Sequence, residues 1–102
     1  MGRKKISKEE LLAFLRRKKA FFYTAYGIRK IGVFGSYVRG EETRESDIDI
    51  IVDMARDRKN IHNLLGFKRY LEKELGVKID VGLETALKPA IRPQVRKEVI
   101  YV

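Results

Sequence analysis

The chain has 102 residues, of which 44% are hydrophobic and 36% charged, a composition that indicates a globular domain and excludes a disordered segment. It has no cysteine and one histidine, which excludes disulfides and zinc sites built from thiolates or several imidazoles. The net charge of +9 favours polyanionic partners such as nucleotides or nucleic acid. Because no apolar run is long enough to cross a bilayer, we expect a cytoplasmic protein with a single domain over residues 1–102.

The N-terminal part of the chain predicts one helix and one strand. Ser7 and Glu10 have the spacing of a capping box, and apolar residues then recur at helical spacing until Gly27, so we expect a helix over 7–26. Residues 28–34 are mostly apolar and are followed by a glycine, which is typical of a short buried strand.

A compact turn and a second strand follow. Residues 35–40 are too few for more than one or two helical turns, and the polar segment 41–46 is loop-like. Acidic and apolar residues then alternate over 47–52. A strand there would turn its isoleucines at 48 and 50 to one face and its two aspartates to the other.

The C-terminal half predicts a helix, a strand and a shorter helix. Apolar residues at helical spacing indicate a helix over 60–75, and alternation over 77–83 indicates a strand whose polar face carries Asp80. Pro93 opens a short helix that ends at Val99, before an apolar tail. The order of these elements indicates an α+β fold, a small mixed β-sheet flanked by helices.

The acidic residues of two strands form a candidate metal site. Asp47 and Asp49 lie about 7 Å apart along one strand and point to the same side, and Asp80 comes from another strand. Three like charges in one place repel each other unless a cation lies among them, and oxygen ligands without His or Cys favour Mg²⁺ or Mn²⁺. An Asp-x-Asp pair taken alone is more often exposed to solvent than bound to metal.

A second candidate feature is the Gly35–Ser36 pair directly after the first strand. In such a bend, backbone N–H groups and a hydroxyl can face phosphate oxygens. An ordinary turn is the alternative for these two residues by themselves. The glycine-rich motifs of dinucleotide-binding and P-loop folds are both missing from the sequence, which argues against those nucleotide-binding folds.

The string GSYVRGEETRESDIDIIVD, in which Gly-Ser is followed after ten residues by Asp-x-Asp, resembles the signature of the DNA polymerase β-like nucleotidyltransferase superfamily. Over its whole length the chain is similar to minimal nucleotidyltransferases that are paired with HEPN-domain partners in prokaryotic toxin–antitoxin systems. The resemblance implies that Gly35 and Ser36 hold the β- and γ-phosphates of ATP and that Asp47, Asp49 and Asp80 hold two Mg²⁺ ions. It also implies that Asp80 helps to take the proton from the attacking hydroxyl.

The function implied by this resemblance is transfer of AMP from ATP to a hydroxyl, namely a tyrosine of a HEPN-type toxin, so that the chain acts as an antitoxin. The short chain offers no second domain for an acceptor, so we expect a heteromeric complex with a separate partner. The alternatives are a non-catalytic antitoxin that acts by binding alone, nucleotidyl transfer to a small molecule, and a nucleic-acid-binding module suggested by the positive charge.

Four further features each allow two interpretations. Arg39, inside the signature, contacts a nucleotide phosphate or pairs with a nearby acid. Tyr37 stacks on the adenine base or packs on the sheet. His62 is interpreted as a capping or surface residue in preference to a base. The basic run 16–19 is interpreted as a solvated helix face, with a partner-binding patch as the alternative.

Overall fold

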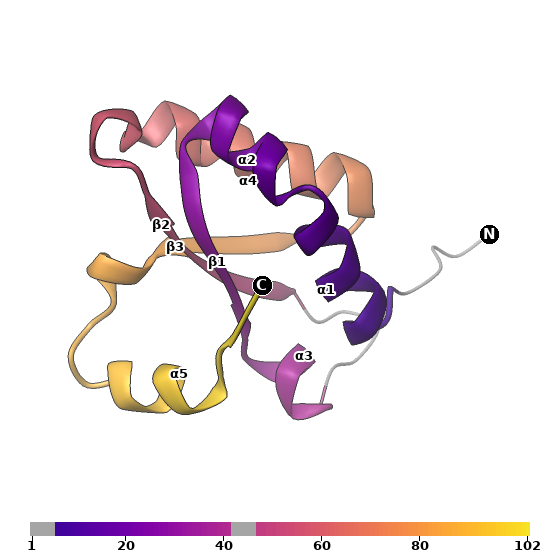
Figure 1. The fold of residues 1–102 in the computed structure, drawn as a ribbon. Coiled ribbons are helices and arrows are strands. Elements are labelled where there is room, and N and C mark those ends of the chain that lie inside the picture. Colours follow the sequence, from indigo (N-terminus) through magenta and orange to yellow (C-terminus); the bar gives the residue numbers. More distant parts are fainter. Residues whose placement is uncertain (1–5, 42–46) are drawn as a thin grey trace.

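The computed structural model describes residues 6–41 and 47–102, and these ranges form a four-stranded sheet with helices on both faces (Figure 1). In chain order the elements are α1 (Lys8–Arg17), α2 (Lys19–Tyr26), β1 (Ile28–Phe34), α3 (Ser36–Arg39), β2 (Ile48–Met54), the 3-10 helix η1 (Arg56–Arg58), α4 (Ile61–Leu75), β3 (Ile79–Leu83), the 3-10 helix η2 (Glu84–Ala86), α5 (Arg92–Glu98) and β4 (Ile100–Tyr101). No helix in the described ranges is long and apolar enough to span a membrane. The loop expected over 41–46 lies outside the described residues except for its first position.

The sheet is mixed, as the sequence predicted, with strand order β3-β2-β1-β4. β1 runs antiparallel to both β2 and β4, whereas β2 and β3 are parallel. A parallel pair needs a crossover connection, and α4 supplies it between β2 and β3. Because β2 and β3 are parallel, residues near the start of both strands lie at the same end of the sheet.

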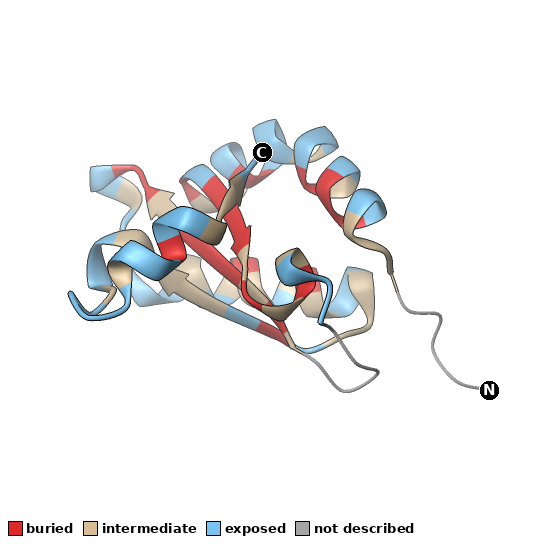
Figure 2. Cartoon of the chain, turned by 90° about the horizontal axis from the view of Figure 1, so that it is seen from below, coloured by how far each residue is buried: buried red, intermediate tan, exposed pale blue. Residues whose placement is uncertain are grey.

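The hydrophobic core lies between one face of the sheet and α1, α2 and α4 (Figures 1 and 2). Ile48 and Ile50 of β2 are fully buried there, as the alternation in the sequence predicted. Phe22 of α2 and Phe67 of α4 meet edge to face, with ring centroids 5.0 Å apart. The opposite face carries α5 (Figure 1), which buries Val95 against the sheet.

The single helix expected over 7–26 is wrong, because Lys18 separates α1 from α2. The capping box at Ser7 and Glu10 is present, but Lys18 leaves the helical conformation with φ −96° and ψ 3°. No glycine or proline marks this position in the sequence. The break lets the chain change direction (Figure 1), so that Leu15 and Phe22 are both fully buried in the one core.

The other boundaries differ from the predictions by one or two residues, and one element is new. The strand expected over 77–83 begins at Ile79, and the short C-terminal helix begins one residue before Pro93. The apolar tail forms β4, in which Ile100 pairs with Val33 and Tyr101 with Gly32. Two residues carry no periodic pattern, so only the long-range pairing with β1 makes them a strand.

Candidate active site

Asp49 and Asp80 lie side by side on the parallel strands β2 and β3. The register pairs these two residues, and on its other side Asp49 pairs with Phe34 of β1. Partners on neighbouring strands are about 4.8 Å apart, and their side chains point to the same face. Since Ile48 and Ile50 face the core, both carboxylates face the opposite side of the sheet, where α5 packs.

Asp47 lies just before β2, whereas the sequence had predicted this residue within the strand. The pairing of β2 with β3 starts at Ile48, whose N–H donates to the carbonyl of Lys78 at 3.1 Å. Asp47 is partly buried at the start of the strand, and its charge still acts on Asp49. The three predicted acids therefore come from one region, with two of them on strands and the third at the end of a connection.

The surroundings of the Asp49 carboxyl disfavour its charged form. Partial burial raises its pKa, and the negative charges of Asp80 and Asp47 raise it further, while Arg39 acts in the opposite direction. A carboxylate in this position is stabilised by any cation that binds beside it. Oxygen ligands without nitrogen or sulfur are those that Mg²⁺ and Mn²⁺ prefer, so the residues fit such an ion.

The carboxylates do not form a complete metal cage. Within 6–41 and 47–102, no three His, Cys, Asp or Glu side chains are grouped closely enough to hold a metal ion. Mg²⁺, however, commonly keeps several water ligands and binds through one or two carboxylates together with the phosphates of a nucleotide. The pair Asp49 and Asp80 matches this second kind of site.

Gly35 is required by its close approach to Asp49. It has φ 82° and ψ −154°, and a Cβ atom at this position would collide with the Asp49 carboxylate. Only glycine tolerates both the conformation and the contact. Ser36, partly exposed, begins the short helix α3, where Val38 and Arg39 each donate a backbone N–H to the Gly35 carbonyl at 3.1 Å. The Gly35–Ser36 bend therefore lies directly against the row of carboxylates that Asp49 and Asp80 form on β2 and β3.

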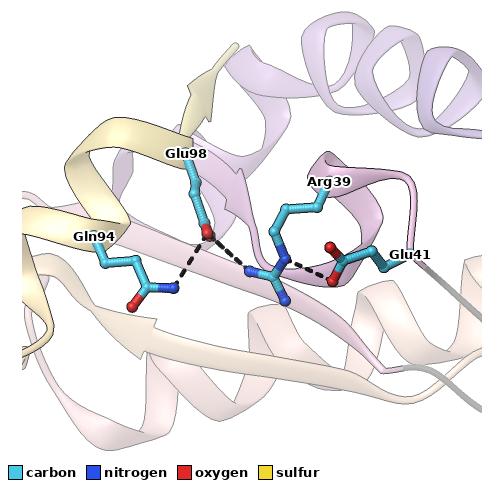
Figure 3. A network of polar contacts seen from close by, with 4 residues as sticks. All are labelled: Arg39, Glu41, Gln94 and Glu98. Carbon is cyan, nitrogen blue, oxygen red and sulfur yellow. Dashed lines mark hydrogen bonds and ion pairs between the residues drawn. The ribbon is translucent and has the colours of Figure 1, made fainter.

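Arg39 at the end of α3 pairs with two glutamates (Figure 3). Its Nε donates to Oε1 of Glu41 at 2.9 Å, and its Nη1 donates to the two carboxylate oxygens of Glu98 at 2.9 and 3.0 Å. Gln94 also donates to Glu98, at 3.3 Å. Pairing with acids, one of the two interpretations of Arg39, is confirmed, whereas a contact with phosphate stays a prediction.

Glu98 brings a further carboxylate close to the Gly35 bend, and no motif in the sequence marks this residue. Hydrogen bonds from Arg39 lower the pKa of Glu98, and the backbone N–H of Gly35 contributes to the same shift. The N–H of the bend therefore lies near enough to an oxygen anion to favour its charged form, and a nucleotide phosphate would present the same kind of group. Glu98 lies 59 residues from Arg39 in a charged helix without a motif, so only the packing of α5 reveals it.

The structure places the remaining candidates either in the core or on the surface. Tyr37 is only 2% exposed and its hydroxyl donates to the carbonyl of Ile6 at 3.0 Å, so packing in the core is confirmed and stacking on a base is wrong. His62 is an exposed residue in the first turn of α4, whose cap is the side chain of Asn60. The basic run 16–19 lies mostly exposed on α1 and α2, as expected of a solvated face.

The sequence of the chain is similar to those of known nucleotidyltransferases. Residues 8–102 match the model of the nucleotidyltransferase domain family. Protein adenylyltransferase MntA of Thermococcus cleftensis is 41% identical over 97 residues, which cover 92% of this chain and 94% of that protein. A candidate protein adenylyltransferase of Methanocaldococcus jannaschii is 41% identical over 73 residues, covering 71% of this chain and 73% of that one.

Solved structures share the architecture. A candidate minimal nucleotidyltransferase superposes with a TM-score of 0.78 at 33% identity, covering 93% of this chain and 95% of the other. A toxin–antitoxin complex, MntA–HpeT, contains a chain with the same fold, with a TM-score of 0.65 at 22% identity over 96% of this chain and 72% of its own. The chain therefore belongs to the nucleotidyltransferase domain family, among the minimal nucleotidyltransferases, and is a nucleotidyltransferase.

Proposed function

We propose that the protein transfers AMP from ATP to a hydroxyl group of a protein partner, with Mg²⁺ in the site and with release of pyrophosphate. The observation that carries this proposal is the pairing of Asp49 with Asp80 on neighbouring strands beside the Gly35–Ser36 bend. The name of the relative with 41% identity, a protein adenylyltransferase, supports AMP as the group transferred and a protein as the acceptor.

Each residue of the site has a proposed task. Gly35 and Ser36 bind the β- and γ-phosphates, and Asp49 and Asp80, with Asp47 beside them, hold the metal. When bound, Mg²⁺ would neutralise the charge of the phosphates and of the departing pyrophosphate. Asp80 is exposed on the edge strand β3, where an acceptor can approach. Its carboxylate takes the hydroxyl proton as the acceptor oxygen bonds to the α-phosphorus and the bond from that phosphorus to pyrophosphate breaks.

The proposed partner is a HEPN-type toxin with a tyrosine as the acceptor, so that the protein acts as an antitoxin in the cytoplasm. The resemblance of the whole chain to minimal nucleotidyltransferases of toxin–antitoxin systems supports this proposal. A toxin–antitoxin structure solved with AMP-PNP also contains a chain of the same fold, with a TM-score of 0.66 at 24% identity.

The test measures whether a radioactive label is transferred from ATP to the partner protein. The protein is incubated with Mg²⁺, its toxin partner and ATP labelled at either the α- or the γ-phosphate. We expect stable label on the partner from α-labelled ATP and none from γ-labelled ATP. Asp49→Asn should abolish the labelling, while Asp53→Asn should retain it, because Asp53 lies on the same strand and face but pairs with Arg29, at 3.8 Å.

The same experiment separates the alternatives. A non-catalytic antitoxin would neutralise its partner equally well as Asp49→Asn and would leave the partner unlabelled. Transfer to a small molecule would place the α-label in a low-molecular-weight product without any partner present. Either result would contradict the proposed function.

A further inference from the structure

A cavity of about 420 Å³ lies on the carboxylate side of the sheet, between β2, η2, α5 and β4. Its volume falls within the range of about 300–1,000 Å³ that is usual for small-molecule sites. Its lining combines apolar and polar side chains, among them Ile51, Leu87, Val95, Arg92, Arg96 and Tyr101. None of these residues takes part in the site described above.

The cavity begins one step along β2 from the row of carboxylates. Ile51, in its wall, lies two residues after Asp49 on β2 and points to the same side, about 7 Å further along the strand. On β3 the corresponding step leads from Asp80 to Gly82, which pairs with Ile51. A ligand whose phosphates lie at the carboxylates therefore reaches the cavity by extending along the sheet over these two strands.

Gly82 keeps the path between the carboxylates and the cavity open. A Cβ atom at this position would meet no atom within 4 Å. Because Ile79 is fully buried on the core side, Asp80 and Gly82 share the opposite face of β3. The backbone of Gly82 has no positive φ, so its conformation does not require glycine.

The walls suit a flat ring with polar edges. Arg92 is held by a hydrogen bond from its Nε to the carbonyl of Leu87 at 3.2 Å, and the Tyr101 hydroxyl donates to Glu84 at 2.9 Å. Arginine planes and aromatic rings stack on nucleobases, and apolar side chains such as Ile51 cover the rest of a base. Tyr37, the aromatic residue first considered for stacking, lies in the core.

The helix α5 connects the cavity to the phosphate side of the site. Its Glu98 accepts hydrogen bonds from Arg39 and lies close enough to the Gly35 bend for that backbone to influence its charge, while Val95, one turn earlier, lines the cavity. One rigid element thus borders both the place proposed for phosphate and the place that remains for the rest of the nucleotide.

We propose that this cavity binds the nucleoside, base and ribose, of the nucleotide donor. The inference rests on the proposed function, since it takes the Gly35–Ser36 bend as the phosphate site. Gly82 is the position that sets access to the cavity, and α5 forms the wall against which the base packs.

The test fills the cavity at its entrance and measures binding, not turnover. Gly82→Phe places a ring over the path between Asp80 and Ile51, and Ala13→Phe, on the exposed face of α1, adds the same ring far from the site. Affinities for Mg–ATP and for Mg–tripolyphosphate, which has no nucleoside, are measured by calorimetry. We expect Gly82→Phe to weaken ATP binding by about tenfold or more, since base stacking contributes on that scale, and to leave tripolyphosphate binding unchanged. Ala13→Phe should change neither.

Photo-crosslinking of the unaltered protein gives a second readout that does not depend on Gly82→Phe being folded. We expect 8-azido-ATP to label peptides within 84–101, which contain most of the cavity wall. Labelling of peptides outside 84–101 would overturn the inference. Unchanged ATP affinity in folded Gly82→Phe would also overturn it, and so would a loss of affinity for the acceptor alone in that variant. If ATP binds and crosslinks at 84–101 but no AMP is transferred, the cavity assignment stands and the proposed function fails.

Discussion

Replacing Asp49 by asparagine should stabilise the fold while it removes the activity. Asparagine keeps the shape of the side chain but removes a charge that burial and the neighbours Asp80 and Asp47 make unfavourable. Two unit charges about 5 Å apart interact by about 3 kcal/mol at an effective dielectric constant of about 20. Because Asp80 is exposed, solvent screening reduces this repulsion, and we expect the free energy of unfolding to rise by about 1 kcal/mol. For a domain of this size that is a rise in Tm of about 4 °C or more.

The effect of this substitution should depend on pH. The pKa of Asp49 in the folded protein lies above its ordinary value of 3.8, so the folded state holds this proton more tightly than the unfolded chain does. The destabilisation is therefore absent below the unfolded pKa and develops as the pH rises through the folded pKa. The gain in Tm from Asp49→Asn should therefore be larger at neutral pH and shrink as the pH falls toward 3.8.

Thermal unfolding followed by circular dichroism, without divalent ions, measures the gain directly. Asp53→Asn is the control, because its partner Arg29 is exposed and a surface pair at 3.8 Å contributes little, so its Tm should change by no more than a few degrees. Added Mg²⁺ should then raise the Tm of the unaltered protein more than that of Asp49→Asn. A lower Tm for folded Asp49→Asn at neutral pH without metal would refute the idea that these carboxylates repel each other.

Three further substitutions test other parts of the site and core. Gly35→Ala should destabilise the protein by about 1–3 kcal/mol from backbone strain alone and abolish transfer, because the added methyl group meets the Asp49 carboxylate; a normal Tm in denaturation experiments would contradict this. Glu98→Gln should tighten ATP binding several-fold in calorimetric titration, because it removes an anion from the Gly35 bend and frees Arg39 for phosphate; weaker binding would show that the carboxylate assists the nucleotide. Phe22→Ala should lower the free energy of unfolding by about 3–5 kcal/mol in urea titration, since the ring is fully buried, and a loss below about 1 kcal/mol would contradict the described core.

The sequence predicted most elements because their signals are local. The alternation in 47–52 shows that Ile48 and Ile50 share a face that excludes Asp49, and the structure confirms this division. The break at Lys18 was not predictable in the same way, since α1 and α2 have continuous helical periodicity and the change of direction depends on the core they cover. The two residues of β4 are likewise too few for a pattern and become a strand only by pairing with β1.

The sequence by itself determined which residue types carry the chemistry, namely a Gly-Ser bend and acids on polar strand faces, because backbone geometry sets the face of each side chain from local spacing alone. The tertiary structure decided that Asp80 lies beside Asp49, that Glu98 comes close to the Gly35 bend, and that a cavity lies further along β2 between Ile51 and α5. Register and packing between distant segments depend on burying one common core, and no short stretch of sequence records which distant partner it will meet there.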